Sequence, residues 1–141
     1  MKFAVALLCD AATVREGLLH LLGGAVTRIW RTGLPAALNV DLALVIALEE
    51  DQLDLPHQVD LTIANEYGVV GQAMGAFQAT RPPKLEPDEA LLVPSVLSLR
   101  HVATNVYGRH TIDVSLDGGA VETKLAFWVL DQAEMSLPPL A

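Results

Sequence analysis

Four histidines are the side chains of this sequence best suited to metal binding or proton transfer. His20, His57, His101 and His110 do not have the close pairing that marks a metal site on a helix or a hairpin. If the strands that flank residues 104–108 are neighbours, strand parity puts His101 and His110 on one face, with Leu99 and Ile112. There the two imidazoles could bind zinc together with a carboxylate. The alternative, which we favour, is that both are strand-end histidines bonded to backbone or water.

Carboxylates gather in two loops and could offer oxygen ligands to calcium. One cluster holds Glu49, Glu50 and Asp51 with Asp54, and the other holds Glu86, Asp88 and Glu89. If these loops met at one end of the fold, they could supply the six to eight oxygens that calcium takes. Neither cluster has the spacing of an EF-hand, so we expect solvated turns.

Nucleophilic side chains lack a recognisable catalytic context. Cys9 is the single cysteine, lies in the apolar run FAVALLC and cannot form an internal disulfide. We expect a buried, reduced thiol, and a reactive thiol is the alternative. No Gly-x-Ser-x-Gly motif surrounds a serine. The sequence therefore predicts no catalytic, cofactor-binding or metal-binding residue, and no cofactor.

The charge of the chain argues against nucleic acid as a partner. Seventeen acidic residues against nine basic ones give a net charge of -8, which repels a phosphate backbone.

One lysine and six apolar or small residues precede Cys9, too few for the core of a signal peptide. The apolar run at residues 42–48 is too short to cross a bilayer. We expect a cytoplasmic protein that does not enter a membrane.

Residues 38–68 carry the clearest alternating pattern, and a β-sheet is the element that this pattern predicts. Val40, Leu42, Leu44, Ile46 and Leu48 share one face of a first strand; Val59, Leu61 and Ile63 share one face of a second. The acidic connector DQLDLPH between them favours a polar turn. We therefore expect an antiparallel pair, with its apolar face covered by a second layer.

The N-terminal segments predict further strands. Residues 2–10 alternate with apolar residues on both faces, and residues 11–17 are expected to form a helical turn or a loop that ends in the turn Arg15-Glu16-Gly17. Residues 18–22 then enter Gly23-Gly24 and continue as a strand to Trp30. We interpret the glycine pair as a bulge or sharp bend, because a phosphate-binding loop needs a spacing and a lysine that are missing here.

Three short motifs in these segments carry a family resemblance: Asp10-Ala11-Ala12, then Leu21-Leu22-Gly23-Gly24, then Arg28-Ile29-Trp30. Together they resemble the N-terminal signature of an uncharacterised bacterial domain family, found mainly in actinobacteria. That family has Asn where this chain has His20. The resemblance implies no reaction and no catalytic residue.

The later segments complete a fold of about eight strands. Residues 69–80 form a weak, glycine-rich strand typical of an edge, residues 81–89 a loop, and residues 90–103 a strand in which Pro94 marks a bulge or an edge. Two more strands flank the turn Asp117-Gly118-Gly119. This predicts an all-β antiparallel sandwich, immunoglobulin-like or a related Greek key, over residues 1–131, with a tail at residues 132–141. The expected core holds Leu42, Leu44, Ile46, Leu61, Ile63, Ile112, Val114 and Phe127.

Composition and the uncharged edge favour self-association. Hydrophobic residues make up 52% and charged residues 18% of the chain, so some apolar surface should be shared with another chain. No charge interrupts residues 69–80, and we expect a homodimer before any larger ring, or a contact with another protein. A monomer with a covered edge is the alternative.

The function that we favour is a non-catalytic binding or assembly module, and the alternative is a ligand-binding or hydrolytic protein.

Overall fold

The computed structural model describes residues 1–134 and is built almost wholly from β-strands. The first sheet has the order β2-β1-β5-β8, with bounds β2 Leu18–Gly24, β1 Lys2–Arg15, β5 Asp41–Leu48 and β8 Leu91–Ser98. The second has the order β3-β11-β10-β6-β7, with bounds β3 Arg28–Arg31, β11 Val121–Asp131, β10 Gly108–Leu116, β6 His57–Asn65 and β7 Gly68–Phe77. A short pair joins β4 (Ala36–Ala37) to β9 (Ala103–Thr104).

Two short 3-10 helices complete the secondary structure of the described part. They are η1 (Glu50–Gln52), between β5 and β6, and η2 (Gln132–Glu134), after β11. Within residues 1–134, no helix has the length and apolar character needed to cross a membrane. The prolines Pro138 and Pro139, which the sequence places in a tail, lie outside the described residues.

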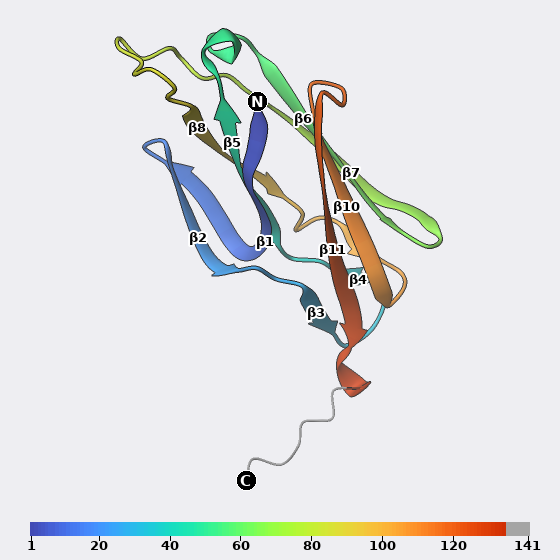
Figure 1. Ribbon diagram of the computed structural model, residues 1–141. Coiled ribbons are helices and arrows are strands. Elements are labelled where there is room, and N and C mark those ends of the chain that lie inside the picture. Colours follow the sequence, from blue (N-terminus) through green and yellow to red (C-terminus); the bar gives the residue numbers. More distant parts are fainter. Residues whose placement is uncertain (135–141) are drawn as a thin grey trace.

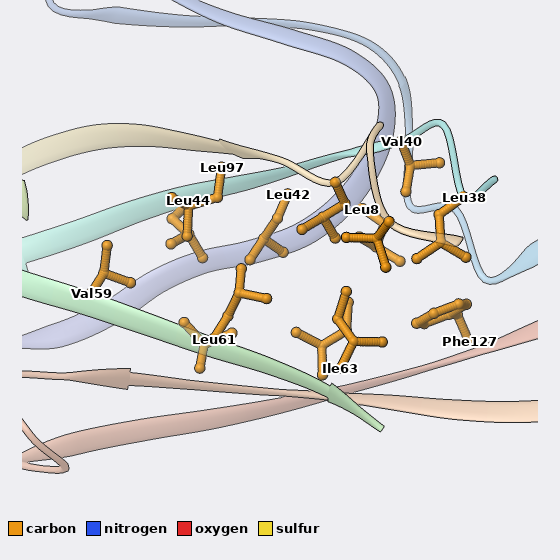
Figure 2. Packing of buried hydrophobic residues seen from close by; sticks show 14 of the residues in the cluster. Leu8, Leu38, Val40, Leu42, Leu44, Val59, Leu61, Ile63, Leu97 and Phe127 are labelled. Carbon is orange, nitrogen blue, oxygen red and sulfur yellow. The ribbon is translucent and has the colours of Figure 1, made fainter. Parts of the chain in front are cut away.

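The two large sheets pack face to face and enclose one hydrophobic core (Figure 1). Figure 2 shows Leu42 and Leu44 of β5 pointing toward Leu61 and Ile63 of β6. All eight side chains expected in the core are at most 2% exposed. The prediction of an all-β sandwich is therefore confirmed, and the inward faces of the strands were assigned correctly.

The expected pairing of residues 38–48 with residues 58–68 is wrong. β5 pairs with β1 and β8 in the first sheet, whereas β6 pairs with β10 and β7 in the second. The connector from Glu49 to Pro56 contains η1 and buries Leu53, so it crosses from one sheet to the other instead of closing a tight turn. The two strands meet through their apolar faces, across the core.

The expectation of a helical turn or loop at residues 11–17 is also wrong for most of that range. β1 continues to Arg15 and pairs with β2, with Thr13 opposite His20. Figure 1 shows β1 running down from the N-terminus, bending, and returning beside β2. Glu16 and Gly17 form the tight turn, with φ angles of 53° and 72°. Two successive positive φ angles are typical of the two-residue turns that close β-hairpins.

Gly23 and Gly24 mark a bend, as expected, but the strand does not continue in the same sheet. Gly23 has φ of +61°, and a side chain there would collide with Asp10. Beyond the bend the chain leaves the first sheet, and β3 adds in parallel to β11 in the second. Because of this bend, the segment after β2 lies in a different sheet from the β1–β2 hairpin.

Of the remaining predicted elements, the strand expected over residues 90–103 ends earlier, at Ser98, and a separate short strand, β9, begins at Ala103. β7 is an edge strand, β8 with Pro94 is another, and the chain between them is largely free of regular structure. β10 and β11 pair around Asp117 and Gly118.

Candidate functional site

The two histidines that parity placed on one face differ in their burial. His110 is fully buried in β10, whereas His101 is exposed. The prediction of a shared face fails because β8 ends at Ser98, so the strand parity used to reach His101 no longer applies. Within residues 1–134, neither side chain belongs to a group of three potential ligands arranged to hold a metal ion.

His110 has partners for both ring nitrogens inside the protein. Its Nε2 lies 2.8 Å from the Thr104 hydroxyl, and its Nδ1 lies 3.0 Å from the Gly108 carbonyl. The ring also stacks on Phe127 at a centroid distance of 5.2 Å. His110 therefore links β9 to the core, and both of its ring nitrogens already have partners within the protein.

His57 forms the one histidine–carboxylate ion pair within residues 1–134. Its Nδ1 lies 2.7 Å from Asp117 and its Nε2 lies 2.7 Å from the Gln52 carbonyl, and since both partners are acceptors, the protonated imidazole donates to both. Burial acts to lower the pKa of His57, but the bonds to Gln52 and Asp117 outweigh it and raise the pKa. Burial likewise opposes ionisation of Asp117, yet His57 and the Gln58 amide lower its pKa. A catalytic histidine needs one nitrogen free to exchange a proton, so this geometry is structural.

The two acidic clusters do meet at one end of the sandwich. Glu49, Glu50 and Asp51 line one side of a cleft of about 970 Å³, and the loop from Glu86 to Glu89 lines the other. Asp54 is instead held by Arg81, which also binds Glu50 at 2.8 Å. In the part of the chain that the structure describes, no three His, Cys, Asp or Glu side chains are arranged to hold a metal ion.

Cys9 is buried, as expected, and its thiol is held in the protonated form. The Sγ atom donates to the Asp41 carbonyl at 3.5 Å. Burial raises the pKa of the Cys9 thiol, the carboxylates of Asp41 and Asp10 raise it further, and Arg100 offsets part of this effect. Because the thiolate is the reactive form, this environment makes Cys9 a poor nucleophile.

The bend of β1 is fixed by a small polar cluster around Asp41 and Arg100. Asp41 accepts a hydrogen bond from the Ala12 amide at 3.0 Å, just beyond the bend. Arg100 donates to the Asp10 carbonyl and to the Asn39 side chain, and its Nε lies 3.4 Å from Asp41 Oδ1. The guanidinium thus joins the chain after β8 to the bend, and this sets the direction of the hairpin.

The β1–β2 hairpin carries the most extensive exposed apolar group in the first sheet. Leu18 is 62% exposed and Leu22 is 73% exposed, and Val14 and Leu21 are also exposed. The register places Leu18 and Leu22 on one face of the hairpin and Val14 and Leu21 on the other, and we call these four side chains together the hairpin surface. Beside them, residues 11–13 and 19–22 enclose a shallow concavity of about 590 Å³. The outer edge of β2 has no pairing strand among residues 1–134.

Sequence reasoning missed this hairpin because it took residues 11–17 as a helical turn or loop, whereas residues 11–15 continue the first strand. Part of a signal was present at Glu16-Gly17, since glycine readily takes the positive φ of a two-residue hairpin turn, but glutamate lacks the preference of Asn or Asp for the position before it. The run of small residues from Ala11 to Thr13 obscured it, because alanine is depleted in strands.

Comparisons with known proteins give a family and no activity. No curated protein and no solved structure matches the chain. A family model described as a family of unknown function, DUF6941, matches residues 4–128, which include every strand of both large sheets except the ends of β1 and β11. The chain therefore belongs to the family of unknown function DUF6941.

Proposed function

We propose that the protein is a non-catalytic β-sandwich module that assembles with a second copy of itself. The observation that carries the proposal is the hairpin surface, which combines exposed leucines with an unpaired strand edge. We also propose a cytoplasmic location, a proposal that the single buried thiol of Cys9 supports.

The lack of charge around the hairpin supports the proposal that another protein chain covers this surface. From Gly17 to Thr27 the chain has no Asp, Glu, Lys or Arg. Monomeric proteins usually protect an exposed edge with a charge, a proline or a bulge, because a bare edge pairs with other chains. A binding partner would cover the leucines and complete the hydrogen bonds of β2.

The state of the polar side chains supports a non-catalytic role. His57 and His110 use both ring nitrogens within the protein, and the Cys9 thiol is buried. These groups stabilise the fold and would have to break existing bonds before taking part in proton transfer or nucleophilic attack. Their arrangement favours an assembly role over the hydrolytic alternative.

Light scattering coupled to size exclusion tests the proposal at micromolar protein concentration. We expect a mass of twice the 15.1 kDa of one chain. A mass near 15.1 kDa across the accessible concentrations would contradict self-assembly.

A further inference from the structure

We propose that two copies of the chain join through β2, in antiparallel pairing about a two-fold axis at His20. This inference rests on the proposed function, because it names the partner as an identical chain and the contact as one strand edge. The product would be a continuous sheet that runs from the first sheet of one subunit into that of the other.

The four edges of the two large sheets differ in how well they can accept another strand. β8 contains Pro94, which has no N–H to donate, and β3 has only four residues with an arginine at each end. β7 has neither proline nor charge, and its Gly71 and Gly75 let Leu97 of β8 and Val102, in the chain after β8, approach closely. β2 has neither proline nor charge along residues 18–22. β2 and β7 are therefore the two edges with neither proline nor charge to protect them, and what distinguishes β2 is that its sequence can pair with a copy of itself.

The sequence of β2 is self-complementary. Leu18-Leu19-His20-Leu21-Leu22 reads the same in both directions. Antiparallel pairing centred on His20 places Leu18 opposite Leu22 of the partner subunit, and Leu19 opposite Leu21 of the partner subunit. Opposite residues in an antiparallel pair share a face, so leucine meets leucine on both faces of the sheet. A two-fold contact requires such a self-complementary patch.

The structure holds this strand in place for pairing. β1 pairs with β2 over residues 11–15 and 18–22, and the turn at Glu16-Gly17 closes the hairpin. At the other end, the Asp41 and Arg100 cluster fixes the bend of β1. Thr13, an uncharged residue, lies opposite His20 on β1, so no charge on the neighbouring strand directly faces the proposed axis.

Lysine substitutions test the edge. His20→Lys would put two positive charges face to face at the axis, and Leu22→Lys would put a charge in place of a leucine contact. Each variant should run at the mass of one chain in light scattering, with an unchanged circular dichroism spectrum. Ala76→Lys, at an exposed position on the edge strand β7, is the matched control and should keep the mass of the unmodified protein.

Cysteine substitutions test the register independently of the lysine variants. At the axis, the Cα atoms of His20 and its copy would be about 4.5–5.5 Å apart, which is within disulfide range. Those of Leu18 and its copy would be about 13 Å apart along the strands, which is too far. Under mild oxidation, His20→Cys should give a covalent dimer on a non-reducing gel, whereas Leu18→Cys should not.

These experiments distinguish a failure of pairing through β2 from a failure of self-assembly as a whole. A dimer that survives both lysine substitutions, or equal cross-linking of the two cysteine variants, would overturn pairing through β2 and leave self-assembly standing. A single-chain mass for the unmodified protein would overturn both.

Discussion

Side chains on the two faces of the first sheet should differ sharply in how much each contributes to the free energy of unfolding. Leu44 is fully buried against the second sheet, whereas Leu92 is 59% exposed on the outer face. Truncation of Leu44 removes buried methyl groups and leaves a cavity, so Leu44→Ala should lower the free energy of unfolding by about 2–5 kcal/mol. Leu92→Ala should lower it by less than about 0.5 kcal/mol.

Guanidinium denaturation at one fixed protein concentration measures both leucine variants. The fixed concentration is needed because association itself adds to apparent stability. If Leu44→Ala costs less than about 1 kcal/mol, below the usual range for such a truncation, the inward face of β5 is wrongly assigned.

The His57–Asp117 pair should make stability depend on pH in a defined window. Folding raises the pKa of His57, so its contribution is complete below the unfolded pKa of about 6.5 and is lost as pH rises through the folded value. Folding lowers the pKa of Asp117, so its contribution is present above about pH 4 and is lost on acidification. The pair therefore stabilises the protein most between about pH 4 and pH 6.5.

Thermal melts of Asp117→Asn test that window. At pH 5 the variant should be less stable than the unmodified protein by about 1–2 kcal/mol, because a hydrogen bond between charged groups is lost. The difference should narrow as the pH is raised past the point where folded His57 loses its proton. Asp113→Asn, which removes an exposed carboxylate that binds Lys124, should show little difference at any pH. If the difference in stability between Asp117→Asn and the unmodified protein widened toward pH 9, the stabilising role of the His57–Asp117 pair would be contradicted.

At the scale of elements, alternation in the sequence predicted which face of each strand is buried but not which strand lies beside it. Leu42 and Leu61 show the same period whether they share a sheet or face each other across a core. The connector between the two strands distinguishes the two cases. Here the connector contains η1 and buries Leu53, and it crosses from the first sheet to the second. Strand neighbours depend on contacts distant in sequence, which a local pattern does not contain.

The bend of β1 was unpredictable for a related reason. It depends on Asp41 and Arg100, which lie far from Ala12 in the sequence and meet it only in the folded chain. The residues at the bend are small and have weak preferences of their own. The direction in which the hairpin surface projects follows from this bend, so that direction could not be predicted from the local sequence.

Removal of the Arg100 side chain should loosen the hairpin without unfolding the sandwich. Arg100→Ala leaves the buried Asp41 carboxylate with the Ala12 amide but without its cation. Since Arg100 is partly exposed, we expect a loss of up to about 1 kcal/mol in local stability. Hydrogen exchange should become faster in residues 10–24 and stay unchanged in β6 and β10. Lys124→Ala, which breaks an exposed ion pair on the second sheet, is the control.

For the whole molecule, charge and apolar surface act in opposite directions on assembly. Each chain carries a net charge of -8, so two copies repel one another as they approach. The hairpin surface and β2 carry no charge within residues 17–27, so attraction there comes from burial of apolar side chains and from strand pairing. A contact of this kind depends on salt in the opposite sense to one made of ion pairs.

Raising the salt concentration should therefore strengthen the dimer. Between about 0.01 M and 0.1 M salt the screening length falls from about 30 Å to about 10 Å, which weakens repulsion between the two acidic subunits. The attraction between leucines is not screened, so the dissociation constant should fall as sodium chloride is added. Sedimentation equilibrium at several salt concentrations measures it, with Ala76→Lys as a control that changes net charge without touching β2. A dissociation constant that rises with salt would show that ion pairs, rather than β2, hold the subunits together.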